Sequence, residues 1–124
     1  MTAGITAAMA NTMLDTIATP MAFVKLHTGD PGSAGTSNAS SVTTRPALAW
    51  ASAASGSKAG NGTLPSWTSW AGTNGEIVTH VSFWSASTAG TFAGSAALAA
   101  SQTLNTGNTF SLTAVTATAT PLAA

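Results

Sequence analysis

The densest run of large apolar and β-branched residues lies at Glu76–Ser85, where side chains alternate between two faces. Turn-rich segments at 71–75 and 86–90 bound this run. Because both faces carry bulky groups, we expect a central strand that is covered on at least one side and partly on the other. One face presents Ile77, Thr79, Val81 and Phe83, and the other presents Val78, His80, Ser82 and Trp84.

Residues Ile5–Ala18 have a helical pattern instead, with Thr2 or Gly4 as the predicted start and Pro20 as the stop. Two interpretations of this helix stay open: it closes one end of its own β-domain, or it is an arm that docks on a neighbouring subunit. In either case its apolar stripe is expected to be buried, because aligned apolar side chains gain free energy when they leave water. The stripe consists of Ile5, Met9, Met13 and Ile17, with Leu14 beside it.

Shorter strands surround the central one, and the segments between them have turn or loop composition. Segments 36–44 and 52–62, rich in Ser, Gly, Ala and Asn, are predicted loops, and 105–108 is a predicted turn. Pro121 in the tail suits an edge strand. The predicted short strands are Met21–Thr28, Arg45–Ala51, Leu64–Trp70, Thr91–Ala99, Ser101–Leu104 and Thr109–Thr118.

This order of elements indicates a mainly β protein, an antiparallel sandwich or barrel that follows one N-terminal helix. We expect a helical arm at residues 1–19 and one β-domain at residues 20–124. Within that domain, Asp30, Pro31 and Gly32 form a structural turn, because Pro presets φ and Gly permits a positive φ.

Charge is the unusual part of the composition. Only 5% of the 124 residues are charged and the net charge is zero, against about 25% charged residues in ordinary soluble domains. A surface solubilised by hydroxyls and amides fits this composition, and so does a surface covered in an assembly, which we favour. Three basic residues argue against nucleic acid, whose phosphates demand many cationic contacts.

The sequence gives no support for a disulfide-stabilised, thiolate-metal, secreted or membrane-spanning protein. The chain has no cysteine, so it has no disulfide framework and no thiolate metal site. No signal peptide and no run of about 20 apolar residues is found, so we expect no membrane partner and synthesis in the cytoplasm.

No catalytic or cofactor site is predicted. Asp15, Asp30 and Glu76 are the only carboxylates, and nothing supports a glycosidase pair among them. His27 and His80 lie in separate predicted strands without the local spacing of metal ligands, so we expect both to be hydrogen-bonded in or beside the sheet.

Tryptophans are the remaining candidates for binding, because an exposed indole can anchor an interface or stack on a sugar. Trp84 is expected in the core. Trp67 and Trp70 are three residues apart and cannot share one face of a strand, so we expect one of them to be exposed. An interface anchor is favoured over a sugar platform, since no acidic or amide cluster accompanies them.

The most specific motif in the chain is Leu26-His-Thr-Gly-Asp-Pro-Gly32. It resembles the LHTxDPG opening of small bacteriophage virion proteins known as tail fibre or minor tail proteins. No charge follows it at 39–41, where family members often carry an acidic residue. Weaker similarity extends over about residues 20–118 through Ala34-Gly-Thr36, Asn38, Arg45–Trp50, Val78–Ser85, Gly90–Gly94, Leu98 and Thr106–Leu112.

The resemblance implies a jelly-roll β-sandwich in a phage particle, with no enzymatic activity. We expect a capsid decoration protein on the head surface, most simply a homotrimer that contacts the major capsid protein or other virion proteins. A minor tail or tail-fibre protein and a host-carbohydrate-binding module are the alternatives. The interface candidates are Ile5, Met9, Met13, Ile17, Trp67 and Trp70.

Overall fold

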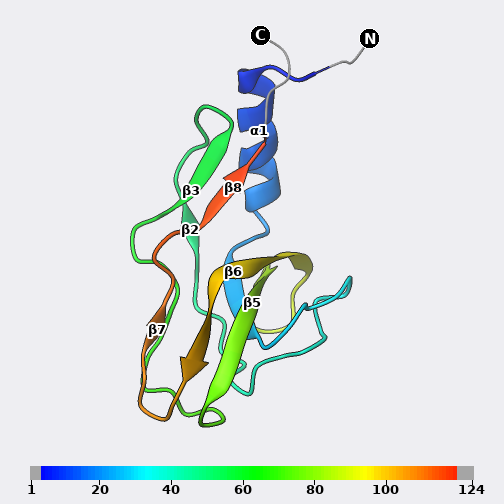
Figure 1. Ribbon diagram of the computed structural model, residues 1–124. Helices are drawn as coiled ribbons and strands as arrows, with labels where there is room; N and C mark the ends of the chain where they lie inside the picture. The colour runs from blue at the N-terminus through cyan, green and yellow to red at the C-terminus, as the bar shows by residue number, and fades with distance from the viewer. Residues whose placement is uncertain (1–3, 120–124) are drawn as a thin grey trace.

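The computed structural model describes residues 4–119, which form one helix and eight strands (Figure 1). All strand pairs in this part of the chain are antiparallel. The predicted mainly β class with a helix near the N-terminus is therefore confirmed. The elements are α1 (Ala7–Ala18), β1 (Phe23–His27), β2 (Ala49–Trp50), β3 (Ser57–Asn61), β4 (Ser66–Trp67), β5 (Glu76–Trp84), β6 (Phe92–Leu104), β7 (Phe110–Ser111) and β8 (Thr116–Thr118).

Strand β5 is the centre of the first sheet, as its alternating pattern predicts. It pairs with β1 on one side and with β6 on the other. Val78, Val81 and Phe83 are buried in the main core, whereas Ile77 at the start of the strand is 52% exposed. Pairing along both edges places the strand between two neighbours, and burial of its side chains places it under a second layer.

The second layer consists of β2, β3 and β8 in that order, with β4 and β7 paired further along the same two chain segments. Its hydrogen bonds continue to the first sheet, because Val24 N–H donates to Pro46 O at 3.1 Å and Leu48 N–H to Ala22 O at 2.8 Å. The strands nearly form a barrel, but it does not close, since no strand pairing joins β6 to β7 or β8 among residues 4–119.

Three sequence predictions are corrected by the observed strands and their pairings. Segment 52–62, predicted as a loop, contains β3, because Ser55 and Gly56 at positive φ reverse the chain and place 57–61 between β2 and β8. Thr109–Thr118 is divided into β7 and β8 rather than continuous, while the strands predicted at 91–99 and 101–104 merge into β6.

The helix starts later than predicted. Thr6 is the N-cap, and its hydroxyl oxygen accepts a hydrogen bond from Met9 N–H at 3.2 Å, which satisfies one of the free amides of the first turn. Neither Gly4 nor Ile5 is helical. The predictions for Thr2 and Pro121 lie outside the described residues. In the described part of the chain, no helix has the length and hydropathy needed to cross a membrane.

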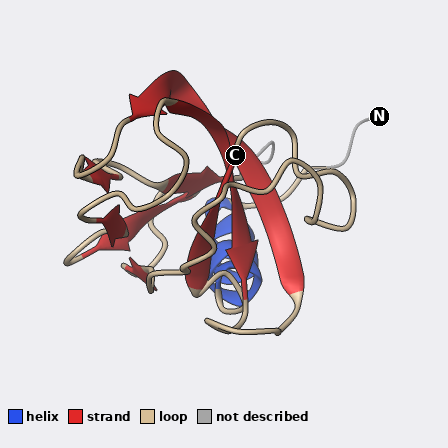
Figure 2. Cartoon of the chain, turned by 90° about the horizontal axis from the view of Figure 1, so that it is seen from below, coloured by secondary structure: helices blue, strands red, loops and turns tan. Residues whose placement is uncertain are grey.

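Helix α1 packs beside β3 and β8 at one end of the molecule (Figures 1 and 2). Its buried face is made of Ala10, Leu14 and Ala18. The small alanines allow the helix axis to lie close to β3, whose own residues are also small or flexible. The larger apolar residues of α1 are consequently left for another surface.

Candidate interaction surfaces

The predicted stripe of α1 is exposed within the protomer, and its burial against a neighbouring subunit stays a prediction. Met9 is 53%, Met13 42% and Ile17 52% exposed, while Ile5 is partly buried ahead of the helix. These three helical residues follow one another at intervals of four, so their side chains form a single row. We call Met9, Met13 and Ile17 the α1 stripe. The helix covers its own β-domain with a different face.

Polar contacts fix the helix on the flank opposite the stripe. Asp15 Oδ1 is 2.6 Å from Lys58 Nζ and accepts the N–H of Ala53 at 3.0 Å, and Asn11 Oδ1 accepts the N–H of Gly56 at 2.9 Å. The hydrogen bond from Lys58 lowers the pKa of Asp15 below its ordinary value of 3.8. These contacts hold α1 in one orientation, so the stripe faces outward as a fixed surface.

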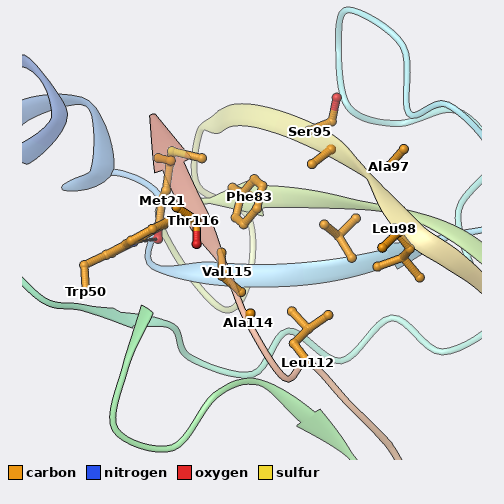
Figure 3. A pocket seen from close by; sticks show the side chains of 14 residues that line it. Met21, Trp50, Phe83, Ser95, Ala97, Leu98, Leu112, Ala114, Val115 and Thr116 are labelled. Atoms are coloured by element: carbon orange, nitrogen blue, oxygen red, sulfur yellow. Dashed lines mark hydrogen bonds between the residues drawn. The ribbon is translucent and has the colours of Figure 1, made fainter. Parts of the chain in front are cut away.

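A groove opens where the barrel fails to close. Two adjoining hollows of about 450 Å³ each share Leu98, Ala99, Leu112 and Ala114. Figure 3 shows β6 residues such as Ala97 and Leu98 along one wall and residues 112–116 along the other, with Met21 and Trp50 at one end and Phe83 between the walls. We call this hollow between β6 and residues 109–117 the seam groove.

Both walls of the seam groove are strand edges with partners on one side only. The inter-strand hydrogen bonds of residues 108–119 go to residues 56–70. On β6, residues 98–101 have no register partner in β5, because the pairing shifts between Val78 and His80. The sequence pattern identified these strands but missed the groove, since alternation does not reveal which edges stay free.

Neither the α1 stripe nor the seam groove carries a charge. The six charged residues are Asp15, Lys25, Asp30, Arg45, Lys58 and Glu76, and none lines the groove. Arg45 lies 4.1 Å from the ring centroid of Trp84, and Glu76 accepts hydrogen bonds from Ser41. The few charges thus lie elsewhere, which leaves the α1 stripe and the seam groove as two separate uncharged surfaces.

The tryptophan prediction needs correction. Trp67 is 4% and Trp70 2% exposed, so both belong to the core and neither is exposed as expected. The alternation rule fails here because β4 ends at Trp67 and the chain turns at Ser69, whose φ is +50°. Their role as interface anchors remains a prediction. Trp84 is buried as predicted, and Trp50 is half-buried with its Nε1 donating to Met21 O at 2.9 Å.

The Asp30–Gly32 turn has the structure expected of its residues. Gly32 has a φ of +76° and its N–H donates to Asp30 Oδ1 at 2.9 Å. Pro31 is buried, and its carbonyl oxygen accepts the N–H of Ser37 at 2.9 Å. This bond positions Ser37, whose own carbonyl lies 2.9 Å from Nδ1 of His27. The turn therefore holds a loop against the first sheet.

The two histidines are opposite one another in the β1–β5 register but differ in surroundings. His27 is completely buried, with Ser37 O and Ser82 Oγ on its two ring nitrogens. Burial lowers the pKa of His27 below its ordinary value of 6.5, against the opposing effect of its hydrogen bond to Ser37. His80 is half-buried, with Nδ1 2.8 Å from the Thr79 hydroxyl.

Comparison with known proteins adds one finding. A family model described as podophage GP4 fiber I protein gp80 matches residues 1–120 of the chain. The match extends across both α1 and the β-domain. No curated protein matches the chain significantly.

Proposed function

The chain belongs to the family of podophage GP4 fiber I protein gp80, and from this membership we propose that it is a structural component of a phage fibre with no catalytic role. The resemblance to phage virion proteins is confirmed at the level of the family. A position in a fibre is proposed because the family is described as a fibre protein. It replaces the head surface as our first choice.

The observation that best supports a structural role is a pair of uncharged surfaces. The α1 stripe is exposed and apolar, and the lining of the seam groove mixes apolar residues with Gln102 and Ser111. Exposed apolar surface of this kind marks a protein–protein contact. The chain is also nearly free of charge, and a net charge near zero promotes association. We propose that the protein associates with itself, most simply as a homotrimer, and with other virion proteins.

A capsid decoration protein that contacts the major capsid protein is the second candidate. It is favoured by the small size of the β-domain and by the absence of an internal sequence repeat, which an extended fibre shaft would need. Such a protein covers the head in many copies, whereas a fibre or minor tail protein is present in few.

A carbohydrate-binding module receives no support from the tryptophans. Three of the four indoles are buried, and the fourth, Trp50, lies at the end of the seam groove. A sugar platform needs an exposed ring face.

Counting the protein in purified particles tests these assignments. Quantitative mass spectrometry, with the major capsid protein as the internal standard, is expected to find few copies per particle. Gold-labelled antibodies are then expected to mark the tail or fibre region. A copy number near that of the capsomers establishes the decoration role instead, and absence from purified particles overturns a virion role altogether.

A further inference from the structure

The α1 stripe and the seam groove are complementary in shape. The stripe presents two methionines and an isoleucine on a convex helix. The groove walls contain the small residues Ala96, Ala97, Ala99 and Ala114, which leave room for large side chains from another molecule. Methionine adapts readily to such a space because its unbranched side chain takes many conformations.

The α1 stripe is also short enough to fit along the seam groove. Eight residues separate Met9 from Ile17, which corresponds to about 12 Å along a helix. The groove follows β6 from Ser95 to Gln102, and seven steps along a strand cover about 23 Å. All three stripe residues fit within the groove, with space left for the helix backbone to lie along it.

Charge favours a second copy of this chain as the occupant. The groove has no charged residue to pair with a charged ligand, so a charged occupant would lose its hydration without compensation. The α1 stripe is itself uncharged and already ordered. Docking it therefore costs little conformational entropy compared with the ordering of a flexible peptide.

The stripe cannot enter the groove of its own protomer. Ala10, Leu14 and Ala18 bind α1 to its own sheet, and Asp15 binds it to Lys58. In this position all three stripe residues are at least 42% exposed. The groove that receives them must belong to another molecule.

We propose that the α1 stripe of one copy seats in the seam groove of a second copy. The inference rests on the self-association proposed above and names the surfaces that produce it. Because the two surfaces differ, two copies can exchange them reciprocally about a twofold axis, or successive copies can pass the contact around a closed ring. A trimer is the smallest ring of the second kind.

Cysteine pairing between different variants tests the contact, since the chain has no cysteine of its own. Met13→Cys and Ala99→Cys are purified separately, mixed and oxidised. We expect a disulfide-linked dimer that contains one copy of each variant. Thr12→Cys, on another face of the same helix, serves as the matched control and should link to Ala99→Cys at least about fivefold less. Equal yields from the two helix positions overturn the proposal.

A charge placed in the stripe gives a second, independent readout. Met13→Glu is expected to weaken association by more than about tenfold in sedimentation experiments at micromolar concentration, because it buries an unpaired carboxylate. Thr12→Glu adds the same charge outside the contact and should associate like the parent. The circular dichroism spectrum should be unchanged in both, since both positions are exposed.

The possible outcomes distinguish self-association in general from the specific contact between the α1 stripe and the seam groove. A parent protein that sediments as a monomer contradicts self-association, and this inference fails with it; the surface then serves another virion protein. A parent oligomer that Met13→Glu leaves intact contradicts only the stripe-in-groove contact and leaves the proposed function standing.

Discussion

The hydroxyl of Ser82 donates a hydrogen bond to Nε2 of His27 at 2.7 Å, deep between β1 and β5. The direction follows from the other ring nitrogen: Nδ1 faces the carbonyl oxygen of Ser37 at 2.9 Å and must carry the proton. Trp84 Nε1–H in turn donates to Ser82 Oγ at 2.7 Å. A neutral His27 therefore completes a buried network in which each polar atom has a partner.

Acid should weaken the fold through this histidine. The pKa of His27 is lower in the folded state than the ordinary 6.5, so below pH 6.5 the unfolded chain binds more protons than the folded one. We expect the free energy of unfolding to be constant just above pH 6.5 and to fall as the pH drops toward the folded-state pKa. Urea denaturation between pH 7.5 and 5 measures this slope.

The matched variants for this pH response are His27→Gln and His80→Gln. The first should remove most of the slope between pH 7 and 5, whatever its effect on stability at neutral pH. The second keeps the buried imidazole and should retain the slope of the parent. If His27→Gln keeps the full slope, another group is responsible.

Removing the Ser82 hydroxyl should be costly. Ser82→Ala leaves Nε2 of His27 and Nε1–H of Trp84 without their partner in the core. Each unsatisfied buried group costs about 1–3 kcal/mol, so we expect a loss of roughly 2–6 kcal/mol in the free energy of unfolding. Ser101→Ala, at an exposed position of β6, is the control and should change stability by less than about 0.5 kcal/mol. Equal effects would show that the network contributes nothing.

Gly35 should tolerate alanine less well than Gly62. Both have positive φ, +72° and +68°, so alanine strains the backbone at either site by about 1 kcal/mol. A Cβ at Gly35 would also overlap the ring of Phe92, whereas nothing lies within 4 Å of one at Gly62. We expect thermal denaturation to show an additional loss of about 1–3 kcal/mol for Gly35→Ala. Indistinguishable variants would mean that Phe92 moves aside freely.

The ion pair that holds α1 can be tested by comparing the melting temperatures of variants in which one or the other partner is replaced. Lys58 is only 7% exposed, and its Nζ contacts Asp15 Oδ1 at 2.6 Å and Ala51 O at 2.8 Å. Asp15→Asn leaves a buried ammonium unpaired, while Lys58→Met removes the charge and keeps an aliphatic chain of similar length. We expect the melting temperature at pH 7 to drop further for Asp15→Asn.

The Asp15–Lys58 ion pair also makes the free energy of unfolding depend on pH, in a lower pH range than His27 does. Because the folded-state pKa of Asp15 lies below 3.8, its contribution is complete above that value and disappears as the pH falls through the folded-state pKa. This window is separate from that of His27. A larger loss in Lys58→Met than in Asp15→Asn would contradict this expectation, because it would show that the Lys58 ammonium stabilises the fold without its carboxylate partner.

Strong local patterns were sufficient for the central part of the fold. The alternation of 76–84 predicted β5, and Asp30-Pro31-Gly32 predicted the turn with Gly32 at positive φ. Strand β3 was missed because Ser57–Asn61 contains no large apolar residue. It is a strand because β2 and β8 supply hydrogen bonds on both sides, and such tertiary pairing overrides local preference.

The interaction surfaces were predicted only in part. The apolar row on α1 was visible from its spacing, but residue size suggested the wrong buried face, because Ala10 and Ala18 pack closely where Met9 and Met13 do not fit. The seam groove depends on which edges of β6 and residues 109–117 remain unpaired. That property belongs to the whole set of strands and has no local sequence signal.

The contact between α1 and β8 also has a consequence for synthesis on the ribosome. These are the first and last described elements, and β8 is paired with β3, while Ala119 N–H donates to Gly56 O at 2.9 Å. The helix and β3 are translated early, but the strand that completes their shared packing emerges last. Since contacts distant in sequence form late, the nascent chain carries an unfinished β3 edge until residue 119 has left the exit tunnel.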